Sequence, residues 1–221
     1  MPEARTTLLK PHDALMSMGY AIVPARGPPK GGEGFDFGLP LDDSLGVRLP
    51  NSTAASWLDG GKHPQDINLC RRGTRKRHEL TPLGARHVGA VLTATAQEHG
   101  LHVPTLAFRG CYAIADTTQA TREDNQGWHT DYLGALVRRW VGKPGCPRSA
   151  IWAPCAPFLL NTLDHGTVRV PKGHVIFFVG TFWHGGGPSL SQRPRFHGFQ
   201  LHESMRVPTG VYSGAEEDHQ A

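Results

Sequence analysis

After Gly100 the sequence is a series of short strand-like segments separated by turn residues, and this pattern limits the folds that the chain can adopt. The segments are rich in β-branched and aromatic residues, and Gly, Pro, Asn or Asp separates them. Several short strands at this spacing are typical of an antiparallel sandwich or jelly roll. The high content of Gly (27) and Pro (18) also suits a turn-rich β fold better than a helical bundle. We expect strands within residues 104–116, 127–140, 149–160, 166–170, 173–180 and 195–203.

The first part of the chain predicts a short helix, a strand and a long loop. Residues 10–20 (KPHDALMSMGY) predict a helix with Pro11 in its first turn and Gly19 at its end. The segment YAIVP that follows predicts a strand at 20–24. Residues 27–50 are rich in Gly and Pro, which predicts a long loop and a candidate lid over a binding site.

Two further helices are predicted before Gly100. Residues 51–61 (NSTAASWLDGG) indicate a short capped helix. The strongest helix signal lies at 81–100, with Thr81 as the N-cap, Pro82 at the first helical position and Gly100 as the C-cap. Four apolar residues at helical spacing are expected to share its buried face: Leu83, Val88, Val91 and Leu92.

These patterns predict a mainly β fold with flanking α-helices, in which N-terminal helices pack outside a C-terminal antiparallel core. A β core of this size is usually one domain, so we expect a single domain over residues 1–221. Within it, the helical and loop part covers about 1–100, the β core about 101–205, and an acidic tail 214–221.

The net charge of +4 is unevenly distributed. Five basic residues crowd into seven positions, which indicates either a solvated loop or a contact for phosphates on nucleic acid or on a phosphorylated or CoA-linked substrate. These residues are Arg71, Arg72, Arg75, Lys76 and Arg77. No apolar run is long enough for a transmembrane helix and the N-terminus lacks a signal-peptide core. We therefore expect a cytoplasmic protein with reduced cysteines, with a nuclear location as the alternative and no membrane partner. The oligomeric state cannot be predicted from the sequence.

A histidine and an aspartate two residues apart, His129 and Asp131 in GWHTDYLG, predict a metal site. Side chains alternate along a strand, so these two face the same side while Thr130 faces away. Two histidines and one carboxylate on one face form the facial triad of non-haem Fe(II) oxygenases. His184 follows the apolar strand 175–179 and is the best candidate for the third ligand.

The spacing of these residues resembles a known superfamily. H-x-D, a distant His and an Arg eleven residues later are similar to the 2-oxoglutarate/Fe(II)-dependent dioxygenases. GHVIFFVGTFWHGGGPSLSQRPR most resembles the last ligand segment of the phytanoyl-CoA dioxygenase family, with His174 where that family often has Asp and Ser189 where it often has Asn. The resemblance covers residues 17–23 and 105–203. It implies a double-stranded β-helix (jelly-roll, cupin-like) core, Fe(II), 2-oxoglutarate and O2, with ascorbate as a candidate reductant.

The resemblance also implies a site for the cosubstrate. Arg195 at the start of a strand would pair with the distal carboxylate of 2-oxoglutarate, and Arg193 is its competitor for this role. Three further residues are candidates for cosubstrate binding: Ser191, Tyr112 and Asn161. Four other histidines are expected to be structural or exposed: His165, His174, His197 and His202.

The expected activity is hydroxylation of a C–H bond in an unidentified substrate, with release of succinate and CO2. A small molecule is the expected substrate, and Gln126 or Trp128 beside the metal strand could touch it. Two alternatives remain open. One is a nucleic-acid base or protein side-chain hydroxylase of the same superfamily. The other is a non-catalytic jelly-roll binding module that uses the basic segment for an anionic partner.

Overall fold

The computed structural model describes residues 9–26, 65–67, 69–104, 106–132 and 146–201. Several predicted features lie outside these residues. They are the loop at 27–50, the helix at 51–61, the segment 133–140 of one strand, His202 and the tail at 214–221.

The two helices of the described residues are α1 (Pro11–Met18) and α2 (Pro82–Glu98), and the capping signals at Gly19 and Thr81 are confirmed. The prediction of Gly100 as the C-cap of α2 is wrong by one residue: His99 is the C-cap, and Gly100 follows it with φ 67°. α1 ends at Gly19, which has φ 79° and whose N–H donates to Leu15 O. α2 begins after Thr81, whose side chain accepts a hydrogen bond from Gly84 N at 3.2 Å. The prediction for Leu83 is wrong: its side chain is 40% exposed, because the buried face of α2 runs through Gly84, Val88, Val91 and Leu92 instead.

Ten strands within the described part of the chain form two antiparallel sheets. Their bounds are β1 (Tyr20–Pro24), β2 (Gln65–Asp66), β3 (Arg75–Glu79), β4 (Ala107–Asp116), β5 (Arg148–Ala153), β6 (Phe158–Thr162), β7 (Gly166–Val170), β8 (His174–Val179), β9 (His184–Gly186) and β10 (Arg195–Leu201). The large sheet has the order β1-β8-β5-β10-β4-β3-β2 and the small sheet the order β7-β6-β9. β1, β2 and β3 show that the N-terminal part adds strands to the large sheet as well as helices.

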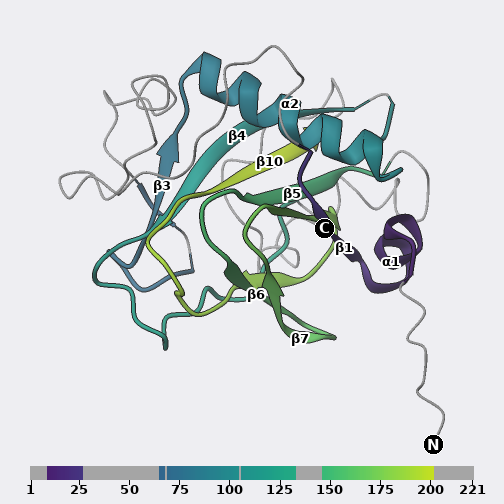
Figure 1. Cartoon of the computed structure of the whole chain (residues 1–221). Coiled ribbons are helices and arrows are strands. Elements are labelled where there is room, and N and C mark those ends of the chain that lie inside the picture. Colours follow the sequence, from purple (N-terminus) through teal and green to yellow (C-terminus); the bar gives the residue numbers. More distant parts are fainter. Residues whose placement is uncertain (1–8, 27–64, 68, 105, 133–145, 202–221) are drawn as a thin grey trace, which may run out of the picture.

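The path of the chain between the two sheets defines a jelly roll (Figure 1). After β4 in the large sheet, His129 bridges to His184 of β9 in the small sheet. The chain returns to the large sheet in β5, crosses to β6 and β7, returns in β8, crosses to β9 and ends in β10. This alternation is the double-stranded β-helix, so the fold is mainly β with flanking helices, as the sequence predicts.

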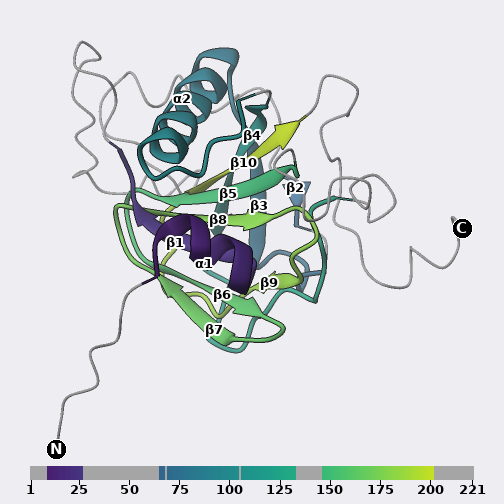
Figure 2. The same ribbon diagram turned by 90° about the vertical axis from the view of Figure 1, so that its right-hand side faces the viewer.

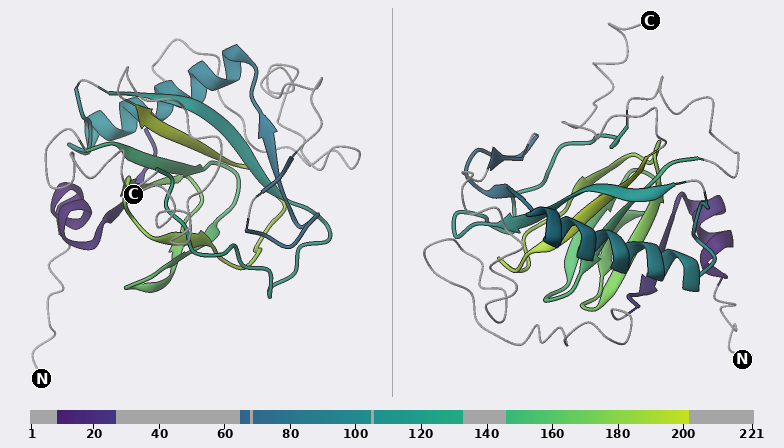
Figure 3. Two further views of the ribbon diagram at one scale, coloured as in Figure 1. Left: turned by 180° about the vertical axis from the view of Figure 1, so that it is seen from behind. Right: turned by 90° about the horizontal axis from the view of Figure 1, so that it is seen from above.

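The large sheet is covered on both faces, and the alternation of side chains along its strands explains how. α2 crosses one face of the large sheet (Figure 3, right), and the small sheet lies on the opposite side, with α1 near β1 (Figure 2). Along β8, Val175 and Phe177 join the core formed with α2, whereas Ile176 and Phe178 join the core shared with β6. The functional side chains described below occupy the same inner layer as Ile176 and Phe178.

The described residues contain four cysteines, and none of them forms a disulfide. Cys70, Cys111, Cys146 and Cys155 are free thiols. Neither helix is long and apolar enough to cross a membrane. The compartment in which the protein works stays a prediction.

Candidate metal centre and its pocket

Three side chains with metal-binding groups converge between the two sheets. His129 and His184 form an isolated antiparallel bridge, in which each N–H donates to the other's carbonyl at 2.9 and 3.0 Å. Asp131 follows two residues after His129 on the same extended segment, so its carboxylate turns to the same side. One ligand atom from each of the three residues lies within 4.8 Å of the other two. All three side chains are buried, with relative exposures of 2–3%.

The backbone orients both imidazoles so that their Nε2 atoms are free for a metal. His129 Nδ1 lies 2.9 Å from Gly127 O, and His184 Nδ1 lies 3.0 Å from Phe182 O. A carbonyl oxygen only accepts hydrogen bonds, so each Nδ1 must carry the proton. Each Nε2 is then a lone-pair donor, and this arrangement of the second ring nitrogen is typical of metal-binding histidines.

Burial and mutual charge give the three residues the protonation states that a metal requires. Burial lowers the pKa of His184 to about 4, and it also lowers the pKa of His129, so both rings are neutral at pH 7. Burial opposes ionisation of Asp131, but the surrounding histidines, His197 foremost, outweigh it and hold its pKa below the usual 3.8. The donor set is therefore two neutral imidazoles and one carboxylate.

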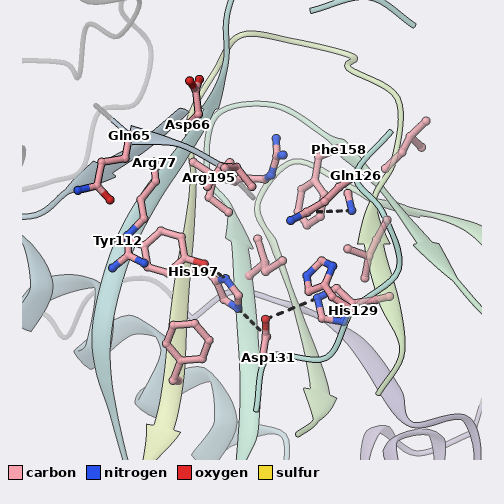
Figure 4. A pocket seen from close by; sticks show the side chains of 18 residues that line it. Gln65, Asp66, Arg77, Tyr112, Gln126, His129, Asp131, Phe158, Arg195 and His197 are labelled. Carbon is pink, nitrogen blue, oxygen red and sulfur yellow. Dashed lines mark hydrogen bonds and ion pairs between the residues drawn. The ribbon is translucent and has the colours of Figure 1, made fainter. Parts of the chain in front are cut away.

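His197, which the sequence predicts to be structural or exposed, lies in the site. It is 3% exposed and belongs to β10, two residues after Arg195. Its Nε2 lies 3.1 Å from Asp131 Oδ2, and its Nδ1 lies 2.7 Å from the hydroxyl of Tyr112 (Figure 4). The available signal was alternation along β10, because a residue two positions after Arg195 shares its face.

Arg195 lies in the same pocket, next to a second buried arginine and one carboxylate. Arg195 Nη2 lies 3.5 Å from Asp116 Oδ1, and Arg75 Nε lies 2.6 Å from the same oxygen. Arg75 also donates from Nη2 to Gly187 O at 2.9 Å. A Cβ on Gly186 would collide with Arg75 Nη1, so the absence of a side chain there makes room for this arginine. Two guanidinium groups face one carboxylate, and the cluster has an excess positive charge.

The pocket has a mixed lining that joins the metal-ligand candidates to Arg195. Tyr112 and Gln126, for which the sequence predicts contact with cosubstrate or substrate, both line it, and their roles stay predictions. Apolar side chains line the rest of its inner wall: Ile114, Ile151, Phe158, Leu160 and Phe199. Residues of β2 and β3 also line it: Gln65, Asp66 and Arg77.

Four residues that the sequence proposes for the site do not line this pocket: Asn161, Ser191, Arg193 and Trp128. Asn161 bonds instead to Asn125 Oδ1 at 3.0 Å and accepts from Thr167. Ser191 Oγ accepts a hydrogen bond from the backbone N–H of Arg193, which places both within one turn. Trp128 is 44% exposed.

The basic segment is a solvated turn only in its first part, where the side chains of Arg71 and Arg72 are 60% and 96% exposed. Residues 75–79 form β3, and Arg75 is buried because it pairs with Asp116 inside the sheet. The other four side chains each lie within 4 Å of a carboxylate: Arg71 of Asp124, Arg72 and Lys76 of Asp66, and Arg77 of Glu79. Arg77 also lies over the ring of Tyr112, 4.2 Å from its centroid. Arg77 is the residue of this segment that lines the pocket.

Comparisons with known proteins give matches among solved structures alone. No protein-family model matches the chain, and no curated protein matches its sequence. An oxidoreductase of the 2OG-Fe(II) oxygenase family from Burkholderia pseudomallei has a TM-score of 0.48 at 13% identity, over 85% of this chain and 88% of that chain. A prolyl-4-hydroxylase from Pseudomonas putida has a TM-score of 0.44 at 12% identity, over 85% and 94%. A prolyl hydroxylase from Trichoplax adhaerens, in complex with a hypoxia inducible factor peptide fragment, has a TM-score of 0.42 at 12% identity, over 96% and 91%.

Similarity at this level assigns neither a family nor an activity to this chain. The resemblance to the phytanoyl-CoA dioxygenase family also stays a prediction, because none of these comparisons bears on it.

Proposed function

We propose that this protein is an Fe(II)- and 2-oxoglutarate-dependent dioxygenase that hydroxylates a C–H bond of a small molecule. The observation that carries the proposal is a pocket lined both by two buried neutral imidazoles and one buried carboxylate, which lie close enough to share a metal, and by the buried Arg195. The overall reaction consumes the substrate C–H group, O2 and 2-oxoglutarate, and yields the alcohol, succinate and CO2.

His129, Asp131 and His184 are the residues that would hold the metal. Their donor set fits Fe(II), which favours two imidazoles and a carboxylate on one face and keeps three positions open for other ligands. The aromatic rings of Phe178 and Phe182 pack against His184, with ring centroids at 4.5 and 6.1 Å, and exclude water from one side of the ligand set. When bound, Fe(II) with 2-oxoglutarate and O2 supplies the oxidising chemistry that these side chains cannot.

Arg195 is the residue that would bind the distal carboxylate of 2-oxoglutarate. A buried guanidinium can hold a carboxylate through two parallel hydrogen bonds. Asp116 balances one of the two positive charges of Arg75 and Arg195, so a second carboxylate would neutralise the cluster. A dicarboxylate with a keto acid at its other end could then extend from Arg195 towards the metal-ligand candidates across the same pocket.

A small molecule is the substrate class that the pocket supports best. Four carboxylates lie within 4 Å of the five basic side chains of residues 71–77 and offset most of their charge, which weakens the case for a nucleic acid, because phosphate binding needs free positive charge. The intact set of three ligand candidates, with Arg195 in the same pocket, argues against a non-catalytic module. A protein side chain remains the alternative substrate, and one similar solved structure is a prolyl hydroxylase in complex with a peptide fragment.

The proposal is tested by anaerobic spectroscopy. Fe(II) and then 2-oxoglutarate are added to the purified metal-free protein, and the visible charge-transfer band between iron and the keto acid is recorded. We expect a band with the wild type and none with His184→Ala, whereas His174→Ala, which changes a histidine outside the pocket, should retain it. A correctly folded wild-type protein that gives no band would exclude the oxygenase function.

A further inference from the structure

Asp131 presents its two carboxylate oxygens to different partners. Oδ1 lies 3.8 Å from His184 Nε2, on the side of the metal-ligand candidates. Oδ2 lies 3.1 Å from Nε2 of His197, on the opposite side. Figure 4 shows His197 and His129 on either side of Asp131. The two oxygens are therefore not equivalent in this pocket.

The hydrogen-bond direction from His197 to Asp131 follows from the chemistry of the partners. A carboxylate that binds a metal is ionised, and an ionised carboxylate only accepts hydrogen bonds. His197 Nε2 must therefore carry a hydrogen, and this N–H donates a hydrogen bond to Oδ2. In the neutral ring, Nδ1 is then a lone-pair acceptor.

Tyr112 completes the arrangement by donating its hydroxyl to that acceptor. The distance from the hydroxyl to His197 Nδ1 is 2.7 Å. Burial and the charge of Asp131 raise the pKa of Tyr112, so the phenol stays a donor. The two residues are directly opposite each other in the register of β4 and β10, and Phe199 packs against the ring of His197 with centroids 4.5 Å apart. The imidazole is thus fixed in both position and tautomer.

We propose that His197, held by Tyr112, is a positioning residue that restricts Asp131 to a single metal-ligating oxygen, Oδ1. This inference rests on the proposed function, because it assigns a role towards the same metal. A carboxylate that binds through both oxygens takes two coordination positions instead of one. A facial triad leaves three positions open only if its carboxylate takes one. The hydrogen bond to Oδ2 keeps that oxygen engaged with the protein.

The test uses Co(II) alone as the probe, with no cosubstrate and no turnover. Two variants of similar size separate the donor from the packing: His197→Gln keeps an N–H in reach of Oδ2, and His197→Leu removes it. The dissociation constant for Co(II) and the visible d–d spectrum, which reports the coordination number, are measured together with the melting temperature. Tyr112→Phe removes the hydroxyl that fixes the tautomer, and His174→Leu serves as a control outside the pocket.

We expect His197→Leu to bind Co(II) about tenfold to a hundredfold more weakly than the wild type and with a changed spectrum. His197→Gln should keep the wild-type spectrum and an affinity within about threefold, and Tyr112→Phe should fall between the two, since outer partners of metal ligands act through orientation. His174→Leu should match the wild type.

Two results would overturn the proposal, and they are distinguishable. Equal Co(II) affinity and identical spectra for the wild type and a folded His197→Leu would remove the role of His197 and leave the metal site standing. Failure of the wild type to bind Co(II) would remove the metal site, and with it both this inference and the proposed function. If His197→Leu does not fold, the Co(II) affinities of His197→Gln and Tyr112→Phe decide. Weaker Co(II) binding by Tyr112→Phe, with unchanged binding by His197→Gln, supports the role of His197. Wild-type Co(II) affinity in both variants overturns it.

Discussion

Arg75 and Asp116 form a buried ion pair between neighbouring strands, with Nε 2.6 Å from Oδ1 and both side chains at most 4% exposed. They stand directly opposite each other in the register of β3 and β4. The same carboxylate oxygen lies 3.5 Å from Arg195, so Arg75 acts on Arg195 through Asp116. This contact explains why a charged strand, RKRHE, lies within the sheet.

Replacement of Arg75 should destabilise the protein strongly. Arg75→Leu removes the partner at 2.6 Å and leaves Asp116 with the longer contact to Arg195 at 3.5 Å, and removal of one partner of a buried pair typically costs roughly 3–5 kcal/mol. Arg72→Leu is the matched control, because Arg72 is 96% exposed and pairs loosely with Asp66 at 3.8 Å. Its free energy of unfolding should stay within about 0.5 kcal/mol of the wild type. Guanidinium unfolding curves of both variants check the difference, and equal stabilities would show that the pair contributes little.

Replacement of Arg195 should weaken 2-oxoglutarate binding without loss of the metal. Arg195→Lys keeps the charge but loses the second parallel hydrogen bond, and a charge-assisted hydrogen bond contributes about 1.5–3 kcal/mol. The dissociation constant for 2-oxoglutarate, measured by calorimetry on the protein loaded with Mn(II), should rise at least about tenfold. Arg193→Lys should leave it unchanged, because Arg193 does not line the pocket. A raised dissociation constant for Arg193→Lys and an unchanged one for Arg195→Lys would instead assign the binding of the distal carboxylate to Arg193.

Acid should destabilise the protein in part through Asp116. Burial raises the pKa of Asp116, but the charges of Arg195 and Arg75 outweigh it, so the folded-state pKa lies below the usual 3.8. A carboxyl with a depressed folded-state pKa stabilises the fold above its unfolded pKa, and this contribution disappears as the pH falls through the folded-state value. Melting temperatures between pH 7 and pH 2 should therefore fall on acidification.

The variant Asp116→Asn isolates that contribution. It should melt at a lower temperature than the wild type at pH 7, because the two arginines lose their carboxylate partner. Below pH 4 its melting temperature should fall less steeply, since one titrating group is gone. Parallel curves for the two proteins over the whole range would mean that Asp116 has the same pKa in the folded and unfolded states.

The sequence predicted the candidate metal ligands because their signal is local or marked by neighbours. His129 and Asp131 are two positions apart, and strand alternation alone puts them on one face. His184 stands out because it follows an apolar strand and precedes a glycine-rich turn. The helix ends at Gly19 and Thr81 were predictable for the same reason, since capping depends on adjacent residues.

The surrounding shell could not be predicted because it depends on strand register. Tyr112 meets His197 across β4 and β10, 85 positions apart in the chain. Arg75 meets Asp116 across β3 and β4, 41 positions apart. A shift of one residue in either pairing would turn one partner to the other face, and no feature of the isolated sequence specifies that register. The strand β3 was not predicted because its sequence is highly charged. In the sequence alone, a buried arginine such as Arg75 cannot be told from a solvated one, since its carboxylate partner is not known.

The exposure of Leu83, which the sequence predicts to be buried, leads to a test of the buried face of α2. Leu83 and Leu92 lie on the same helix, but their exposures are 40% and 0%. Leu92→Ala opens a cavity between α2 and the large sheet, and such truncations cost about 2–5 kcal/mol. Leu83→Ala should change the free energy of unfolding by no more than about 0.5 kcal/mol, because Ala is an even better helix former and little buried surface is lost. Denaturant midpoints of the two variants measure the contrast directly. A loss at Leu83 as large as that at Leu92 would mean that Leu83 is covered in solution, whereas the expected difference would fix the rotation of α2 on the sheet.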